Sequence, residues 1–365
     1  MDISIFGKSV KLNVEQEVLS KVLEIELDGY RVKEENFTSD IEINFVPKIE
    51  LPKEYSHTPS THFTFIDGFL IDYGNVKIKF TQRDILYIDI EYALKNSMIN
   101  QFRAIDFRSK VDNIGLVLHE LVFVPMMFFY DENALIHASS MKSRDGFVLM
   151  FGGTGGVGKT SLELLLCREL DYSFISDDIA IIDKKSYIYP NLSYPKIYAY
   201  NIVGNRTFEN TLFENRSFMD KFQWRLFRKI KGDSRVRRSI SPFKIFGSVE
   251  TKSNGIDIYY ILSKTDSVDE IEFEEIDYKM ASQMTLDIMK NEYSSVLQHI
   301  VWHEYNAKLI SIEPIITTEE IYKNWLSCYE NVLREKKSIV VKIPDNIEHH
   351  DFLNQMKKKL ERVND

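Results

Sequence analysis

The chain has 365 residues, enough for one large or two ordinary domains. Hydrophobic residues make up 44% and charged residues 28%, which is ordinary for a folded protein and argues against a disordered one. The net charge of −9 argues against a broad nucleic-acid-binding surface, and only two cysteines exclude a disulfide framework. We see no signal-peptide pattern and no apolar run long enough to span a bilayer, so we expect a cytoplasmic protein without a membrane partner.

Short segments of alternating apolar and polar residues dominate the first part of the chain. Period-two segments separated by Pro, Gly, Asn and Asp are typical of half-buried antiparallel strands. The clearest are 42–46, 62–66, 76–80 and 85–90. We therefore predict a β-rich N-terminal domain over residues 1–112, followed by a buried helix over 116–129.

The middle of the chain alternates between strand-like and helix-like segments. Strands are expected at 134–137, 147–151, 172–176 and 179–182, with a helix over 160–170. Strands flanking a helix in this way indicate an α/β core. Farther on, the pattern predicts a strand at 256–262, helices at 278–298 and 319–334, and an amphipathic helix at 349–363. We therefore predict an α/β core over 113–340 and a C-terminal helical tail over 341–365.

The strongest functional signal is a glycine-rich segment that fits the phosphate-binding loop (P-loop) pattern G-x4-G-K-[ST]. In such a loop, backbone N–H groups converge on phosphates, the lysine neutralises β- and γ-phosphate oxygens, and the hydroxyl ligates Mg²⁺. The expected strand before it and helix after it supply the required context. We predict that ATP is bound with Mg²⁺ by Gly153, Thr154, Gly155, Gly156, Val157, Gly158, Lys159, Thr160 and Ser161.

Two aspartates follow the next predicted strand. Asp177 lies 18 residues after Lys159 (177 − 159), the spacing expected if one helix crosses back to a neighbouring strand whose end faces the loop. One carboxylate would hold Mg²⁺ together with Thr160, while its neighbour would accept the proton of an attacking hydroxyl. The sequence leaves open whether Asp177 or Asp178 has which role. A plain turn at a strand end is the alternative interpretation.

His137 lies in the segment Ala134-Leu-Ile-His-Ala-Ser-Ser140, one predicted strand before the loop. A histidine among apolar residues is, on its own, usually structural. Together with the glycine-rich segment and Phe174-Ile-Ser-Asp-Asp178, however, this segment resembles the catalytic core of the HPr kinase/phosphorylase family. It is similar, more distantly, to the nucleotide site of phosphoenolpyruvate carboxykinases and to the cores of lasso-peptide-tailoring kinases.

The resemblance covers about residues 134–195. It implies a P-loop kinase core of the HPr kinase/phosphoenolpyruvate carboxykinase type, following the β-rich N-terminal domain. It also implies that His137, Lys159, Asp177 and Asp178 are catalytic, and that Thr160 and the two aspartates hold Mg²⁺.

These observations predict an ATP-dependent phosphotransferase that phosphorylates a serine-type hydroxyl on a protein or peptide. Two alternatives stay open, because a core of this type does not define the acceptor. One is a kinase of a small hydroxylated metabolite, and the other is a nucleotide-gated binding module without phosphotransfer. The sequence also leaves open whether the chain forms a homo-oligomer.

A basic segment stands out in this acidic chain. Nine lysines and arginines lie within residues 221–244: Lys221, Arg225, Arg228, Lys229, Lys231, Arg235, Arg237, Arg238 and Lys244. A solvated helix face is the plain interpretation. The alternatives are an element that docks an acidic partner, or one that supplies an arginine to the transferring phosphoryl group. Nucleic-acid binding is a weaker third alternative, because few aromatic residues are interleaved.

A pair of histidines also has suggestive spacing. His299 and His303 would share one face of a helix, but no His-Glu-x-x-His pattern is present. We therefore do not expect a zinc site there.

Overall fold

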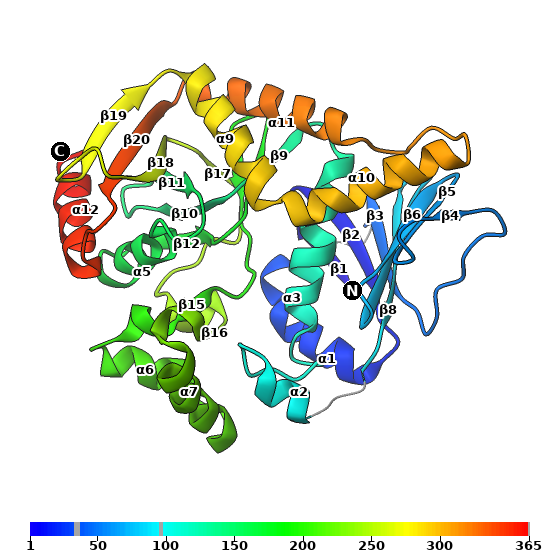
Figure 1. Cartoon of the computed structure of the whole chain (residues 1–365), viewed down its shortest axis with the longest axis horizontal. Helices are drawn as coiled ribbons and strands as arrows, with labels where there is room; N and C mark the ends of the chain where they lie inside the picture. Colours follow the sequence, from blue (N-terminus) through cyan, green and yellow to red (C-terminus); the bar gives the residue numbers. More distant parts are fainter. Residues whose placement is uncertain (33–36, 95–97, 364–365) are drawn as a thin grey trace. The chain divides into compact units, whose positions relative to one another are not determined.

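The computed structural model describes residues 1–32, 37–94 and 98–363 and has a mixed α/β structure with several sheets (Figure 1). The chain divides into two compact units. Unit 1 comprises Met1–Lys95, Lys110–Ala134 and Met289–Cys328, and unit 2 comprises Asn96–Ser109, Leu135–Ile288 and Tyr329–Asp365.

This division differs from the predicted segments 1–112, 113–340 and 341–365. Residues 289–328 return to unit 1, while strand β20 (Lys337–Pro344) runs across the boundary predicted at 340. The reason is physical: periodicity along the sequence reports local structure, whereas a compact unit is defined by segments that pack together from distant parts of the chain.

Unit 1 is built on an eight-stranded sheet in the order β1-β2-β3-β8-β7-β6-β5-β4. Its strands are β1 (Asp2–Ile5), β2 (Lys8–Asn13), β3 (Ile41–Phe45), β4 (Ser56–His57), β5 (His62–Phe65), β6 (Gly68–Asp72), β7 (Val76–Gln82) and β8 (Leu86–Tyr92). Burial alternates along β3 and β8, as the period-two sequence pattern predicts for a sheet with one covered face.

The sheet of unit 1 is not wholly antiparallel, which corrects the sequence prediction. β2 pairs with β3 in parallel, and β3 pairs with β8 in parallel. Parallel neighbours need a long crossover connection, and helix α1 (Glu17–Glu26) provides one between β2 and β3. The pairs from β8 to β4 are antiparallel.

The predicted buried helix over 116–129 is confirmed as a run of short helical turns. They are α3 (Ile114–Leu118), the π-helical turn η2 (His119–Phe123), α4 (Val124–Met126) and the 3-10 turn η3 (Met127–Phe129). Unit 1 also contains η1 (Asp28–Tyr30) and α10 (Ser294–Leu309). Three elements cross from one unit to the other: β9 (Asn133–Ile136), α9 (Tyr278–Glu292) and α11 (Thr318–Leu333).

Unit 2 is built on a six-stranded sheet in the order β12-β10-β11-β18-β20-β19. The strands other than β20 are β10 (Ala138–Lys142), β11 (Val148–Gly153), β12 (Ser173–Ser176), β18 (Ile258–Thr265) and β19 (Glu272–Ile276). Every residue of β11 is buried, as expected for a central strand covered on both faces. Helix α5 (Lys159–Glu169) follows β11 and contacts β10, β11 and β12.

The pairing in this sheet brings the ends of three strands to one edge. β10 is antiparallel to both β11 and β12, so β11 and β12 run in the same direction. The carboxyl ends of β11 and β12 therefore lie at the same edge as the amino end of β10. The sequence analysis expected β12 to be the direct neighbour of the loop-bearing strand. Instead β10 lies between them, because the hairpin turn at 143–146 folds β10 back onto β11.

Unit 2 contains further strands and helices outside this sheet. A second sheet has the order β17-β14-β13-β9, and β15 and β16 form a separate pair. Their bounds are β13 (Ala180–Asp183), β14 (Tyr187–Tyr189), β15 (Lys196–Tyr198), β16 (Arg237–Ser239) and β17 (Asn254–Gly255). The helices are α2 (Met98–Arg103), η4 (Ala199–Ile202), α6 (Arg206–Phe213), α7 (Phe218–Lys231), η5 (Asp233–Arg235), α8 (Pro242–Ile245) and α12 (His349–Val363).

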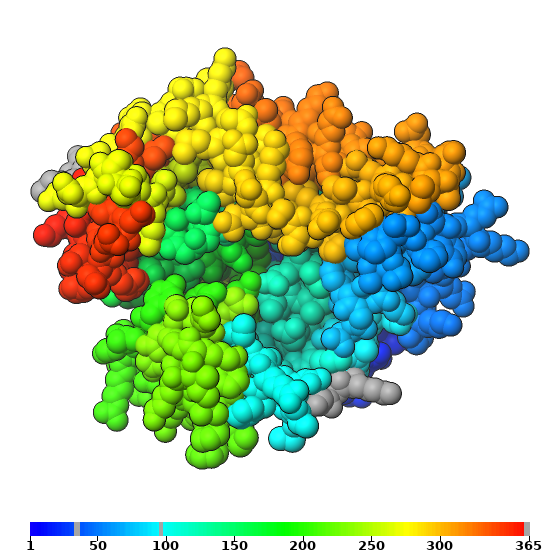
Figure 2. Space-filling model, viewed as in Figure 1, coloured from blue at the N-terminus to red at the C-terminus, as the bar shows by residue number. Residues whose placement is uncertain are grey.

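The C-terminal helix is an integral part of unit 2. α12 begins and ends where the sequence predicts, and it packs beside α5 (Figures 1 and 2). Its buried residues Phe352, Met356 and Leu360 recur every four positions and form one apolar stripe. Among the described residues, no helix is both long and apolar enough to cross a membrane.

Candidate functional site

The glycine-rich loop, residues 153–158, connects β11 to α5 and depends on glycine at two positions. Gly153 and Gly158 have φ angles of 142° and 107°, a region that side chains rarely adopt. A Cβ atom on Gly153 would lie 2.6 Å from the carbonyl oxygen of Leu262, and one on Gly158 would lie 2.7 Å from the ring of Phe352. Both backbone conformation and close packing therefore require the glycines of the motif.

Lys159 and Thr160 begin α5 at the mouth of this loop. The Lys159 ammonium is buried and donates hydrogen bonds to the carbonyl oxygens of Gly153 and Thr154, both at 2.9 Å. The cation is thus held over the loop, on the side where backbone N–H groups of such loops meet phosphate oxygens.

Asp177 is the buried acidic group of the site. It follows the last residue of β12, and its Oδ1 accepts hydrogen bonds from Ser139 Oγ of β10 (2.8 Å) and from Thr160 Oγ1 of α5 (3.2 Å). Two oxygen groups of the kind that Mg²⁺ prefers, the Asp177 carboxylate and the Thr160 hydroxyl, therefore converge beside the glycine-rich loop.

Asp178 points to a different set of partners. Its Oδ1 lies 3.1 Å from His137 Nε2, and its Oδ2 lies 3.3 Å from the Lys196 ammonium. The Asp178 side chain is 54% exposed, whereas that of His137 is only 8% exposed. Because His137 directly precedes β10, the reversed direction of that strand is what brings the histidine to the aspartates.

The backbone at Asp178 adopts an uncommon conformation. Its φ angle is 65°, and the N–H of Ile179 donates a 2.7 Å hydrogen bond to the carbonyl oxygen of Asp177, which closes a three-residue γ-turn. A positive φ at a non-glycine residue costs on the order of 1–3 kcal/mol and is often found at functional sites. This turn separates the two neighbouring carboxylates and aims them at different partners.

The surroundings of Asp178 keep it ionised. Partial removal of this half-exposed carboxyl group from water would by itself raise its pKa. The hydrogen bond from His137 and the charges of Lys196, His137 and Lys159 outweigh that effect and hold the pKa of Asp178 well below its usual range. The group is therefore a carboxylate at neutral pH.

Glu163, one helical turn after Lys159, is a second buried acidic group. Its side chain is fully buried, and within the described residues neither carboxyl oxygen makes a hydrogen bond of good geometry. Burial first, and then the negative charge of Asp177, raise the pKa of Glu163 well above its ordinary value. The neutral, protonated form is the one that this environment favours.

The structure brings all the predicted site residues together in unit 2. Ser139, Glu163 and Lys196 also belong to the site and were not predicted from the sequence. Ser139 lies two residues after His137, a spacing that places both on one side of an extended segment, and Glu163 is an isolated acid in a run of leucines. Lys196 carried no such signal, because it reaches Asp178 from the separate strand β15.

The basic segment contains a buried ion pair rather than a row of free arginines. Arg238 is completely buried, donates to Asp220 Oδ1 at 2.6 Å and contacts the Gln223 side chain at 2.5 Å. It also donates to the carbonyl oxygen of Ile105 at 3.0 Å. Arg238 is therefore structural, which corrects its proposed place in a docking surface, whereas Arg235 is exposed.

The two histidines at helical spacing lie in unit 1, where His303 is buried and His299 is half-buried. His303 contacts Thr64 Oγ1 and the backbone N–H of Ile315, while His299 Nδ1 lies 2.6 Å from His62 Nε2. Burial lowers the pKa of both His299 and His303 to about 4. In the part of the chain that the structure describes, no cluster of three His, Cys, Asp or Glu side chains could hold a metal ion.

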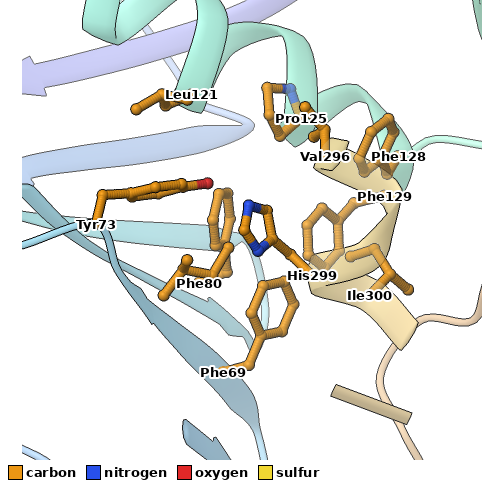
Figure 3. Close-up of a pocket in the computed structure, with 11 residues that line it drawn as sticks. Phe69, Tyr73, Phe80, Leu121, Pro125, Phe128, Phe129, Val296, His299 and Ile300 are labelled. Atoms are coloured by element: carbon orange, nitrogen blue, oxygen red, sulfur yellow. The ribbon is translucent and has the colours of Figure 1, made fainter. Parts of the chain in front are cut away.

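A cavity beside His299 is too small for a substrate. Figure 3 shows His299 among aromatic side chains that include Phe80 and Phe129. The cavity measures about 10 Å³, which leaves room for one water molecule at most.

No protein-family model matches the sequence, and no curated protein matches it at the threshold that we set. The geometry of the site and the motif residues themselves therefore indicate the function.

The protonated state of Glu163 can be tested through stability. Replacement by Gln keeps the shape of a neutral carboxylic acid but cannot ionise. Well below the ordinary glutamate pKa of 4.5 the group is protonated in the folded and unfolded wild type alike. Above that pH the unfolded carboxyl ionises first, so the wild type loses stability as the pH rises towards the folded pKa. We therefore expect the Tm of Glu163→Gln to rise relative to that of wild type as the pH increases. The difference between the two Tm values should grow by at least about 2 °C between about pH 4.5 and pH 8. Thermal unfolding would measure this, and a constant difference would contradict it.

The buried Arg238 predicts a large effect from a single substitution. Arg238→Met leaves Asp220 buried without its closest cation, and we expect a loss of about 3–5 kcal/mol in the free energy of unfolding. The matched control is Arg235→Ala, which removes an exposed arginine from the same segment and should change stability by less than about 0.5 kcal/mol. Urea unfolding at neutral pH measures both, and similar values would show that the ion pair is not structural.

Proposed function

We propose that the protein is an ATP-dependent phosphotransferase with a P-loop kinase core of the HPr kinase type. The observation that carries this proposal is the convergence of Lys159, Thr160 and Asp177 at the glycine-rich loop, with the His137–Asp178 pair next to them. Phosphoryl transfer needs little covalent chemistry from a protein and depends on positioning and charge neutralisation, which these groups supply.

The nucleotide would bind with its phosphates on the glycine-rich loop. Loop N–H groups would contact phosphate oxygens, and the Lys159 ammonium would exchange its loop carbonyl partners for β- and γ-phosphate oxygens. The first turn of α5 adds the positive end of a helix dipole at the same place.

Thr160 and Asp177 fit a magnesium ion that arrives with the nucleotide. Mg²⁺ usually binds through one or two protein oxygens plus phosphates and waters, so a ready-made cage of three acidic side chains is not required. The Thr160 hydroxyl and the Asp177 carboxylate already touch, at 3.2 Å, and Asp177 is buried. When bound, the ion would neutralise charge on the phosphate oxygens.

Asp178 is the better candidate for the proton acceptor. Its half-exposed carboxylate can be reached by an acceptor molecule, whereas Asp177 is buried. In the proposed step, the acceptor hydroxyl oxygen forms a bond to the γ-phosphorus as the bond to the β-phosphate oxygen breaks. ADP leaves, and the hydroxyl proton passes to Asp178. His137 and Lys196 hold this carboxylate in place.

The proposed acceptor is a serine-type hydroxyl on a protein or peptide. A small hydroxylated metabolite would use the same groups at the loop. A phosphotransfer screen of the purified protein with ATP against peptides and metabolites separates these two acceptors. Tight ATP binding with no transfer to any acceptor would favour a nucleotide-gated binding module instead.

Lys159→Ala should abolish phosphotransfer, because it removes the cation that faces the β- and γ-phosphates. The matched control is Lys185→Ala, which removes an exposed lysine from the same unit. Phosphotransfer at saturating ATP is the measurement. A Lys159→Ala enzyme with wild-type turnover would refute the proposed function.

Asp177→Asn and Asp178→Asn should affect different kinetic properties of phosphotransfer. Loss of the Asp177 carboxylate should raise the Mg²⁺ concentration needed for half-maximal activity. Loss of the Asp178 carboxylate should lower kcat by about 10²–10⁴-fold while ATP binding is kept. Asp171→Asn is the control, since Asp171 is an exposed aspartate that also has a positive φ, of 56°. If both site variants match this control, the aspartates form only a turn.

A further inference from the structure

A second cavity in unit 2 adjoins the start of α5. It measures about 150 Å³ and is partly open to solvent. Its lining comes from α5, η4, the segment between η4 and α6, α6 itself and α12. A cavity of 150 Å³ is known to hold one benzene ring, so this one is large enough for a flat ring system.

The cavity continues from the place where the loop would hold phosphates. Ser161 lines it and directly follows Thr160, whose hydroxyl lies at the candidate Mg²⁺ site. Arg168 lines its other end, seven residues farther along the same helix, which corresponds to about 10 Å. A nucleotide whose β- and γ-phosphates lie near Lys159 would therefore extend along this face of α5.

The far wall of the cavity combines a guanidinium group with an aromatic ring. The guanidinium carbon of Arg168 lies 3.7 Å from the ring centre of Phe208. Within the described chain, the buried Nη1 atom of Arg168 has no hydrogen-bond acceptor. Guanidinium planes stack on nucleic-acid bases and donate to their ring nitrogens and carbonyl oxygens, so this arrangement is suited to a heterocyclic base.

Two asparagines add donors to the same lining. Asn205 also lines the cavity, and its Oδ1 accepts from the backbone N–H of Phe208. Asn201 Oδ1 accepts from Tyr198 N–H, and its NH₂ group donates to Ser161 Oγ. The lining also includes the Glu169 carboxylate and the His349 ring, so it offers both donors and acceptors, as a base with its ribose hydroxyls requires.

We propose that this cavity binds the base of the nucleotide whose phosphates lie on the glycine-rich loop, with the ribose at its open side. The inference rests on the proposed function, because it places the rest of that nucleotide. It assigns Arg168 as the residue that contacts the base.

The experiment compares Mg²⁺-ATP with Mg²⁺-tripolyphosphate, which has the phosphates but no nucleoside. Isothermal titration calorimetry with the full chain gives both dissociation constants. Wild type should bind ATP at least about tenfold more tightly than tripolyphosphate. Arg168→Met removes the donor, and Leu353→Trp fills the cavity from α12. Each should weaken ATP binding by about tenfold or more and leave tripolyphosphate binding within about twofold.

The controls separate failure of this inference from failure of the proposed function. Lys358→Met removes an exposed cation from α12 outside the cavity and should bind both ligands as wild type does. Lys159→Ala should weaken binding of both ligands. Two outcomes would overturn the inference about the cavity and leave the proposed function intact. In one, wild type binds ATP and tripolyphosphate equally. In the other, folded Arg168→Met and Leu353→Trp bind ATP as wild type does. Binding of neither ligand by wild type would overturn both proposals.

Discussion

The buried carboxylate of Asp177 is the interaction on which the candidate site depends. A polar group removed from water must be compensated by hydrogen bonds, and Asp177 obtains them from Ser139 on β10 and Thr160 on α5. One carboxylate thereby joins the end of β12 to the neighbouring strand and to the helix that follows the glycine-rich loop. Burial and the neighbouring charge of Asp177 raise the pKa of the Glu163 carboxyl, which favours its uncharged form beside Asp177.

Strand direction then decides which groups can meet. Because β10 is antiparallel to both of its neighbours, its amino end and the carboxyl ends of β11 and β12 share an edge. His137 consequently meets Asp178 although 41 positions separate them in the chain. The γ-turn at Asp178 directs this carboxylate away from Asp177, and the strain of its positive φ is offset by the contacts to His137 and Lys196.

Local features of this structure could be predicted from the sequence, and long-range ones could not. The strand, glycine-rich loop and helix from β11 to α5 follow from apolar patterning and glycine placement, and α12 follows from its apolar stripe. Periodicity contains no information on pairing partners, so the insertion of β10 between β11 and β12 was missed. For the same reason Arg238 could not be distinguished from the exposed Arg235, since its burial depends on Asp220 and Ile105. The motif predicted the site residues that are close in sequence, but not Lys196 on its separate strand.

The conformation of the glycine-rich loop also depends on a segment far along the chain, the C-terminal helix α12. The ring of Phe352 occupies the space that a side chain at position 158 would need, and Phe352 is anchored by the same stripe as Met356 and Leu360. The last glycine of the loop is therefore both conformationally required and covered by α12. A loop held in this way has its backbone N–H groups arranged before a ligand arrives, so less ordering is required at the moment of binding. Residues of α12 also line the cavity beside α5. The segment predicted as a C-terminal tail is therefore part of the candidate site.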